Sequence, residues 1–319
     1  MSYLREKVLV IVGPTAVGKT SLSIELAQLF QGEIISGDSL QVYEDLNIGT
    51  AKVTEEEQQG VPHFLIDVRK KEENYSAYDF QQTGRQLIHD IKERGHLPIV
   101  VGGTGLYIQS LLYPFDLGGT PSLEAEELRE ELELFEKEQG KEALWQRLKE
   151  VDELASANIH PNNVKRVIRA IQVKTLTGNS LLNQTGPDIR QLSEALYDVK
   201  LIGLTTDREV LYQRINERVD IMMTEGLLEE AKLLKNTRDY QSAQGIGYKE
   251  FFPYFDGQIS LEEAIQQVKQ NSRRYAKRQL TWFRNRMTVE WWDILSSDEQ
   301  RQALVESVAT WLDIPESRK

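Results

Sequence analysis

Eight residues near the start of the chain have the types and spacing of a phosphate-binding loop. They match the pattern G-x-x-x-x-G-K-[ST] and are Gly13, Pro14, Thr15, Ala16, Val17, Gly18, Lys19 and Thr20. In such a loop the glycines permit a tight turn, backbone N–H groups converge on phosphate oxygens, and the next helix N-terminus adds partial positive charge. We expect Lys19 to contact the terminal phosphate and the Thr20 hydroxyl to bind Mg²⁺. The motif predicts a diphosphate or longer ligand, and taken alone it favours an ATP-dependent kinase or ATPase.

Two aspartates follow short apolar segments and are candidates for chemistry. Asp38 comes just after the segment 33–36, where an open α/β sheet presents its ligands, and a turn cap is the alternative role. Asp67 ends the run 64–66 and resembles the metal-binding aspartate of a Walker B strand. Such endings are common in buried strands, so metal contact and an ordinary strand end both remain open for Asp67.

A pair of arginines in the second half of the chain has the spacing of one helical face. Arg214 and Arg218 are four residues apart in a helical pattern. They can bind phosphate together, or they can pair with Glu217 and Asp220.

The elements that must position these residues alternate between strand and helix. Apolar runs predict buried strands at 8–12, 33–36, 63–68 and 97–101, and helical patterns occupy 19–30, 77–94 and 106–112. This order is typical of an α/β domain with a parallel sheet. The phosphate loop lies between the first strand and the first helix, which is the context that its motif requires. We therefore predict an α/β fold with a P-loop NTPase-like parallel sheet core.

This alternation is interrupted by a segment that we interpret as an inserted helical domain, residues 117–197. A breaker cluster at 118–121 precedes long polar helices, and a buried-strand pattern resumes only at 199–204. The core domain is then expected to comprise 1–116 and 198–319, with C-terminal helices at 208–234 and 261–286.

Composition narrows the class of protein. The chain has 319 residues and no Cys, which excludes disulfides, Cys-ligated zinc and Cys nucleophiles. No apolar run approaches the roughly 20 residues that span a bilayer, and the first residues lack the apolar stretch of a secretory signal. We expect a cytoplasmic protein without a membrane segment.

Charge is unevenly distributed along the chain. The net charge of −12 argues against nucleic-acid binding, but residues 154–187 and 264–289 contain no Asp or Glu and several Lys and Arg. Two basic segments on an acidic protein can hold a polyanion, and solvated helix faces are the alternative.

Several further segments, taken with the phosphate loop, resemble the tRNA dimethylallyltransferases, also called isopentenyltransferases. They are Ser36–Tyr43, Asn47–Lys52, Val101–Tyr107, His160–Ala170, Gln213–Asp220 and Gln244–Glu250. The resemblance covers nearly the whole chain. The chain resembles the bacterial form of this family. It has no Cys, whereas eukaryotic relatives can carry an appended zinc finger.

The resemblance implies transfer of a dimethylallyl group from dimethylallyl diphosphate to N6 of the adenosine 3′ of the anticodon. The phosphate loop would then hold a leaving group and not a phosphoryl donor. The implied partners are the tRNA anticodon stem-loop and dimethylallyl diphosphate, with Mg²⁺ as the cofactor, and we expect a monomer.

The same resemblance assigns four candidate catalytic residues. Asp38 is implied as the general base, since a carboxylate can accept a proton as an exocyclic amine attacks. Arg214 and Arg218, with Lys19 and Mg²⁺, would stabilise the departing diphosphate. Thr104 would contact the nucleotide or help to place the leaving group, and a helix N-cap is its alternative role.

Contacts with tRNA are expected from the site and from outside it. The target adenine must leave its stack to enter a pocket, where side chains beside Asp38 can read its edge. The candidates are Asp38, Ser39, Leu40, Gln41 and Thr104, then Asn162, Asn163, Val164, Lys165 and Arg166 in the insertion, then Gln244, Gly245, Ile246, Gly247, Tyr248 and Lys249.

Two other functions remain as alternatives. A P-loop small-metabolite or nucleoside kinase accounts for the phosphate loop, Asp67 and the arginine pair, but not for the basic segments. A non-catalytic RNA-binding protein accounts for the basic segments but leaves the phosphate loop and Asp38 without a role.

Overall fold

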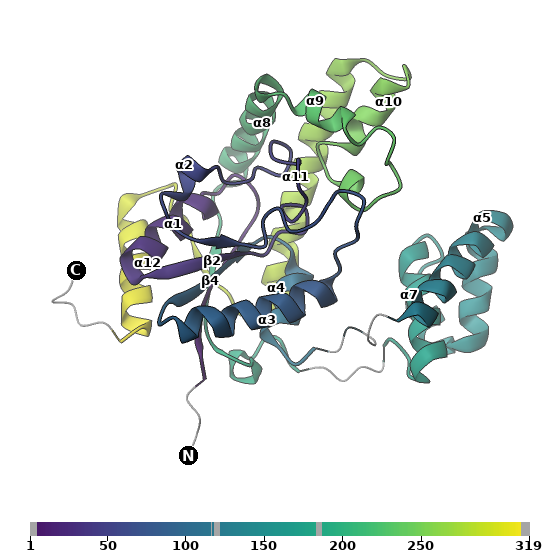
Figure 1. Cartoon of the computed structure of the whole chain (residues 1–319), viewed down its shortest axis with the longest axis horizontal. Coiled ribbons are helices and arrows are strands. Elements are labelled where there is room, and N and C mark those ends of the chain that lie inside the picture. Colours follow the sequence, from purple (N-terminus) through teal and green to yellow (C-terminus); the bar gives the residue numbers. More distant parts are fainter. Residues whose placement is uncertain (1–4, 116, 118–121, 183–186, 314–319) are drawn as a thin grey trace. The chain divides into compact units, whose positions relative to one another are not determined.

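Six parallel strands form one sheet in the order β3-β2-β4-β1-β5-β6, and Figure 1 labels the neighbouring strands β2 and β4. The computed structural model describes residues 5–115, 117, 122–182 and 187–313. The strands are β1 (Lys7–Val12), β2 (Gly32–Ser36), β3 (His63–Phe64), β4 (Leu97–Gly102), β5 (Asp198–Leu204) and β6 (Glu290–Trp292). The strands β4 and β5, which follow one another in the chain, lie on opposite sides of β1, and the carboxyl ends of strands at such a switch point are where open α/β sheets bind ligands.

Each face of the sheet has its own hydrophobic core. Val8, Val10 and Val12 of β1 belong to one core, and Leu9 and Ile11 belong to the other, as the alternation of side chains along a strand requires. On the first face pack α3 (Ala77–Glu93), α4 (Gly105–Leu112) and α11 (Leu261–Arg286), and on the second pack α1 (Lys19–Phe30) and α12 (Asp298–Trp311).

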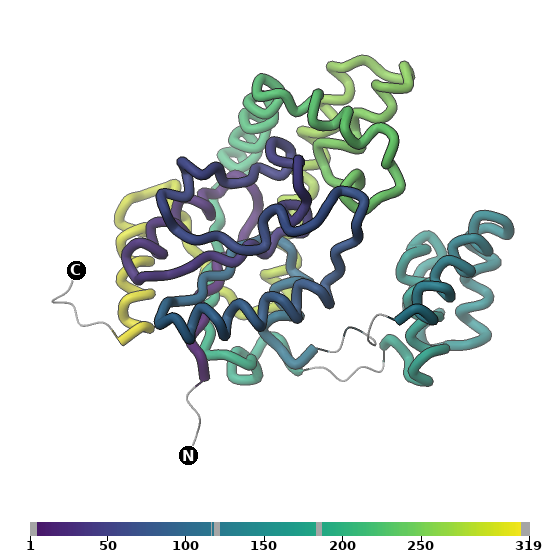
Figure 2. The backbone as a smooth tube through the Cα atoms, in the orientation of Figure 1, coloured from purple at the N-terminus to yellow at the C-terminus, as the bar shows by residue number. Residues whose placement is uncertain are grey.

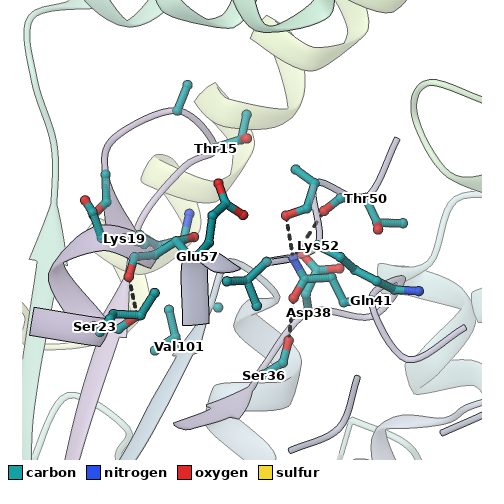
Figure 3. A pocket seen from close by; sticks show the side chains of 18 of the residues that line it. Thr15, Lys19, Ser23, Ser36, Asp38, Gln41, Thr50, Lys52, Glu57 and Val101 are labelled. Atoms are coloured by element: carbon teal, nitrogen blue, oxygen red, sulfur yellow. Dashed lines mark hydrogen bonds between the residues drawn. The ribbon is translucent and has the colours of Figure 1, made fainter. Parts of the chain in front are cut away.

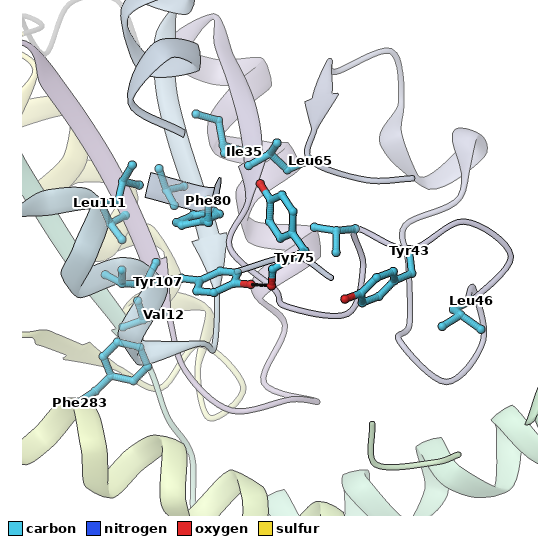
Figure 4. Packing of buried hydrophobic residues seen from close by; sticks show 14 of the residues in the cluster. Val12, Ile35, Tyr43, Leu46, Leu65, Tyr75, Phe80, Tyr107, Leu111 and Phe283 are labelled. Atoms are coloured by element: carbon cyan, nitrogen blue, oxygen red, sulfur yellow. Dashed lines mark hydrogen bonds between the residues drawn. The ribbon is translucent and has the colours of Figure 1, made fainter. Parts of the chain in front are cut away.

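Aromatic side chains fill the core under the connection between β2 and α3. Phe80 stacks on Tyr107 with ring centroids 4.4 Å apart, and Tyr75 meets Tyr107 edge-on at 6.3 Å (Figure 4). The Tyr107 hydroxyl donates to the Tyr75 carbonyl at 3.2 Å. This packing anchors α4, whose N-terminus borders the site.

A second compact unit comprises residues 114–187. Its helices are α5 (Leu123–Val151), α6 (Glu153–Asn158) and α7 (Val164–Thr177). They share a separate core that includes Leu144, Leu148, Val167 and Ile171. The expected helical insertion is therefore present in the chain.

The boundary of the insertion differs from the expected 117–197 at its C-terminal end. Residues 188–197 belong to the sheet-containing unit. Leu196 N–H donates to the Leu112 carbonyl at 2.8 Å, and the Tyr113 hydroxyl donates to the Ile189 carbonyl at 2.9 Å. Ala195 and Tyr197 are buried in the same core as α4. These contacts explain why the core begins before β5, in a segment that carries no strand pattern.

Further α-helices lie between β5 and α11. They are α8 (Arg208–Glu225), α9 (Leu227–Lys232) and α10 (Phe252–Phe255), and α2 (Glu55–Gln58) lies in the long connection between β2 and α3. The single helix expected at 208–234 is broken at Gly226, whose φ of 108° is compatible with glycine but not with helix continuation. Within the described residues, no helix is long and apolar enough to cross a membrane.

Most of the predicted helices and strands agree with the structure, but the predictions for the two edge strands of the sheet, β3 and β6, do not. The strand expected at 63–68 ends at Phe64, because Leu65 and Asp67 have positive φ values that leave the extended conformation. Neither β6 nor α12 was expected. The predicted class, a parallel α/β core with a phosphate loop after β1, a helical insertion and C-terminal helices, is confirmed.

Candidate active site

The phosphate loop lies between β1 and α1, at the carboxyl edge of the sheet. A Cβ on Gly13 would lie 2.6 Å from the Leu204 carbonyl oxygen, so only glycine allows this approach to β5. Gly18 has a φ of 88° at the N-cap of α1, a left-handed conformation that glycine adopts without strain. The Lys19 ammonium donates to the Pro14 carbonyl at 2.5 Å. The loop is therefore folded as a cradle, with its lysine directed across it.

The surroundings of Lys19 shift the pKa of its ammonium group. Burial, reinforced by Arg218, lowers the pKa of Lys19 to about 8, and only Asp38 opposes that shift. Among the described residues Lys19 has no ion-pair partner. A bound diphosphate would supply the missing negative charge.

A cavity of about 1040 Å³ extends from the phosphate loop to the C-terminal end of β2. Lys19 and Asp38 both line it (Figure 3), and all of its lining residues belong to the sheet-containing unit. The remaining polar lining side chains include Thr20, Ser36, Gln41, Glu57, Arg214, Arg218, Tyr275 and Gln279. The cavity thus joins a phosphate cradle to a carboxylate.

Asp38 is recessed in the wall of this cavity. Its Oδ1 accepts the Leu40 N–H at 2.8 Å, which is the turn-capping contact that its position allows. Burial raises the pKa of the Asp38 carboxyl, while the Leu40 N–H and Lys19 partly oppose that shift. A carboxylate with a raised pKa is a stronger proton acceptor, so the cap and the base roles are compatible.

The arginine pair lies on the face of α8 that borders the cavity. Arg214 Nε donates to the Ala16 carbonyl of the phosphate loop at 2.8 Å. Arg218 makes no hydrogen bond or ion pair to any described residue, and burial lowers its pKa, opposed by Glu57 and Glu225. The alternative pairing with Glu217 and Asp220 is not formed, because Glu217 bonds Gln213 and Asp220 bonds Lys269.

Thr104 occupies the N-cap position of α4, yet its side chain makes no capping bond. Its buried Oγ1 has no hydrogen-bond partner in the described part of the chain. An orphaned buried hydroxyl costs stability, which is explained if a ligand or water completes it. Thr104 does not itself line the cavity, although its neighbour Gly103 does.

Two residues of α11 that sequence reasoning did not single out, Tyr275 and Gln279, line the cavity. Gln279 Nε2 donates to the Gly103 carbonyl at 3.0 Å, which orients the amide so that its buried Oε1, without a partner among described residues, is the free acceptor. Burial raises the pKa of the Tyr275 phenol to about 12, and Asp38 adds to the shift. The only available signal was the helical pattern of the basic segment, which does not indicate which side faces a cavity.

Gln41 does not present a free amide to the cavity. Its Oε1 accepts the Ser36 hydroxyl at 2.8 Å, and its Nε2 donates to the Thr50 and Ala51 carbonyls at 3.2 and 3.3 Å. Both N–H donors are therefore used within the protein. Ser39 and Leu40, the other two candidates beside Asp38, are half-buried.

Asp67 does not contact the phosphate loop. It forms an ion pair with Lys52, and β3, which precedes it, is separated from β1 by β2 and β4. Asp67 does not line the cavity, because β3, the strand that precedes it, lies at the edge of the sheet.

The segment 244–249 contains both buried and exposed residues. Gly245, Gly247 and Tyr248 are buried, whereas Gln244 and Lys249 are exposed and Ile246 is half-buried. The Tyr248 hydroxyl donates to Glu230 at 2.7 Å. Tyr248 therefore braces the protein interior, and only the exposed members of this segment are open to a partner.

The candidate residues of the insertion form the N-terminal turn of α7. Asn163 is the N-cap residue, Val164 packs against the unit's core, and Asn162, Lys165 and Arg166 are exposed. The first turn contains no acidic residue, so the positive end of the helix dipole adds to the two cationic side chains. This surface can receive phosphates.

The possible metal ligands that line the cavity near the phosphate loop are oxygen atoms. No group of three or more His, Cys, Asp or Glu side chains that could hold a metal occurs among the described residues. Exposed Thr20 lines the same cavity as Asp38 and Glu57. Hydroxyl and carboxylate oxygens suit Mg²⁺, which usually takes its remaining ligands from substrate phosphates and water.

Comparison with known proteins places these features in context. Residues 41–286 match the sequence family described as IPP transferase. A curated relative from Enterococcus faecalis, named tRNA dimethylallyltransferase, is 60% identical over 312 residues, which are 98% of this chain and 99% of the relative.

Two solved structures are also similar. The full-length tRNA isopentenylpyrophosphate transferase of Bacillus halodurans is 49% identical, with a TM-score of 0.71 and 97% of each chain covered. A eukaryotic dimethylallyltransferase acting on tRNA is 30% identical, with a TM-score of 0.78, and the match covers 97% of this chain and 80% of that one.

Proposed function

This chain belongs to the IPP transferase family, and we propose that it transfers the dimethylallyl group of dimethylallyl diphosphate to N6 of the adenosine 3′ of the tRNA anticodon. The enzyme is a tRNA prenyltransferase, as its relatives are. One observation carries the detailed proposal: a single cavity joins the phosphate loop to Asp38. A kinase would need a phosphoryl acceptor there, and the comparisons do not favour that alternative.

The bond-forming step needs a proton acceptor beside the amine. The N6 lone pair attacks C1 of the dimethylallyl group, the C1–O bond to diphosphate breaks, and the excess proton on N6 passes to the Asp38 carboxylate. The raised pKa of Asp38 suits this transfer. The Leu40 N–H keeps one carboxylate oxygen in place and leaves the other for N6.

The departing diphosphate needs positive charge. Lys19 and Arg218 line the cavity without ion-pair partners in the described structure, and Arg214 braces the phosphate loop through the Ala16 carbonyl. Mg²⁺ held by Thr20 and the diphosphate oxygens would add Lewis-acid stabilisation of the leaving group. Cationic groups fixed before the reaction lower the barrier because they need no reorganisation as the charge develops.

We propose that the acceptor base enters the same cavity beside Asp38. We propose that Gln279 Oε1, which lines the cavity, and Thr104 Oγ1, which follows the cavity-lining Gly103, bond the extruded adenosine or the leaving group. The exposed residues Asn162, Lys165 and Arg166 of α7 would grip the anticodon stem-loop. Gln244 and Lys249 are the exposed members of the segment 244–249 and would add contacts. We propose that the enzyme acts on tRNA in the cytoplasm as a monomer.

The deciding experiment is incubation with unmodified tRNA, Mg²⁺ and radiolabelled dimethylallyl diphosphate in the absence of ATP. We expect label at the adenosine next to the anticodon, mapped by nuclease digestion. Absence of label, with ATP consumed when metabolites are offered, would establish the kinase instead.

A further inference from the structure

A buried carboxylate outside the cavity holds the loop that follows the Asp38 turn. Glu230 of α9 is only 6% exposed. Its Oε2 accepts the backbone N–H groups of Asn47 and Ile48 at 2.7 and 2.8 Å, and its Oε1 accepts that of Gly49 at 2.8 Å. Three successive N–H groups directed at one anion form a nest. Here the anion comes from a helix some 180 residues further along the chain.

Tyr248 closes the same contact from the other side. Its hydroxyl donates to Glu230 Oε1 at 2.7 Å, and burial, reinforced by Glu230, raises the pKa of Tyr248, so that the phenol remains a donor. A Cβ on Gly49 would lie 2.6 Å from the Tyr248 ring. The loop is thus clamped between a carboxylate and an aromatic ring, and Figure 2 shows the loop beside the segment 226–250.

The clamped loop is bonded in turn to the strand end that carries Asp38. Thr50 and Ala51 follow the nest directly, and their carbonyls accept the Gln41 amide. Gln41 also accepts the Ser36 hydroxyl (Figure 3), so the turn from Ser36 to Gln41 is closed around Asp38. A displacement of the nest would therefore move the Asp38 carboxylate.

We propose that Glu230 is a positioning residue for prenyl transfer: by holding the nest at 47–49 it fixes the Asp38 carboxylate relative to the phosphate loop. This inference rests on the proposed function. Glu230 does not line the cavity, whereas Asn47, Ile48, Thr50 and Ala51 do. Glu230 therefore acts on the reaction through the loop and touches neither substrate.

The test substitutes Glu230→Gln, which keeps the shape of the side chain but has one acceptor oxygen in place of two. At least one N–H of the nest then faces an amide NH₂, and the loop must shift. We expect kcat with saturating tRNA to fall by roughly 10²-fold, because small misplacements of a catalytic group have effects of that order. The KM for dimethylallyl diphosphate should stay near the wild-type value, since the phosphate loop is untouched.

The matched control is Glu33→Gln. Glu33 is also a buried carboxylate, 3% exposed, but it lies at the amino end of β2 and bonds Arg94 and His96. We expect this variant to melt at a lower temperature and to retain wild-type kcat. The pair separates a positioning role from a purely structural one.

A second variant keeps the proposal testable if Glu230→Gln does not fold. Gly49→Ala leaves Glu230 intact and forces the loop away from the Tyr248 ring, so we expect the same fall in kcat with little change in KM. Wild-type kcat in folded Glu230→Gln, or in Gly49→Ala, together with only a lower melting temperature, would overturn the proposal. Failure of the wild-type protein to prenylate tRNA would instead overturn the proposed function, before any variant is compared.

Discussion

The two ends of the parallel sheet treat buried charge in opposite ways. At the amino end, Glu33 accepts hydrogen bonds from Arg94 Nε and Nη2 at 3.0 and 2.6 Å and contacts His96 Nδ1 at 2.5 Å. The bond from Arg94 is the main cause that lowers the pKa of Glu33. The charge at this end is therefore neutralised by the protein itself.

At the carboxyl end the charges face one cavity and stay apart. Asp38, Lys19 and Arg218 form no ion pair within the described ranges of the chain, and burial shifts the pKa of each toward its neutral form. Such groups reduce the stability of the fold, and they are retained where a ligand or a reaction uses them. The contrast marks the carboxyl end as the functional one without reference to any motif.

The largest expected effect comes from removing the carboxylate of the functional end. Asp38→Asn should lower kcat by about 10²–10⁴-fold, the range of general-base catalysis. Because the folded-state pKa of Asp38 is raised, its ionised form destabilises the fold above that pKa and costs nothing below its ordinary pKa. The variant should therefore melt at or above the wild-type temperature at neutral pH, and this gain should vanish in acid. Single-turnover rates and thermal unfolding at several pH values measure both, and wild-type kcat would contradict the assignment.

A smaller loss is expected from the cation of the phosphate loop. Lys19→Ala should lower kcat/KM for dimethylallyl diphosphate by roughly 10²–10³-fold, as removal of one preorganised charge does. In the wild type, Lys19 is charged below its pKa of about 8, so kcat/KM should fall as the pH rises through that value. Lys19→Arg serves as the control, because arginine stays charged and should remove this alkaline decrease. An alkaline decrease that persists in Lys19→Arg would assign it to another group.

A third variant tests the orphaned hydroxyl. Thr104→Val keeps the shape of the side chain and removes Oγ1, which has no partner among the described residues. If a substrate completes this hydroxyl, kcat/KM should fall about tenfold, the value of one hydrogen bond of roughly 1.4 kcal/mol. Stability should not fall, because no capping bond is lost. Unchanged kinetics together with reduced stability would show a structural cap instead.

How far the sequence alone predicts this site depends on how local its interactions are. Gly13 to Thr20 and Asp38 are set by short-range geometry at strand ends, and their placement followed from motif and pattern. Glu230 carries no such signal: a glutamate on a polar helix reads as a surface residue, and its three backbone partners lie near residue 48. The same limit applies to Tyr248, which looked like a tRNA contact and is buried against Glu230.

The second limit on prediction from the sequence is the short length of some elements. The strand β6 has only the residues Glu290–Trp292, too few for alternation to be recognised, and its parallel pairing with β5 joins residues some 90 positions apart in the chain. Asp67 was ambiguous for a related reason, because a run that ends in aspartate does not indicate whether its strand is central or at the edge of a sheet. Sheet order decided that question.

The smallest effect on activity is expected at the amino end, where charge is already paired. Arg94→Met leaves the Glu33 carboxylate with His96 as its remaining partner, so the melting temperature should fall. Since the pKa of Glu33 is lowered in the folded state, its contribution is fully present above its ordinary pKa and is lost as the pH falls through the lowered value. The difference in melting temperature between variant and wild type should therefore be largest near neutral pH and should shrink in acid, while kcat at 25 °C stays unchanged. A fall in kcat as large as that of Thr104→Val would mean that the two ends of the sheet are coupled, and the division between a structural and a functional end would be wrong.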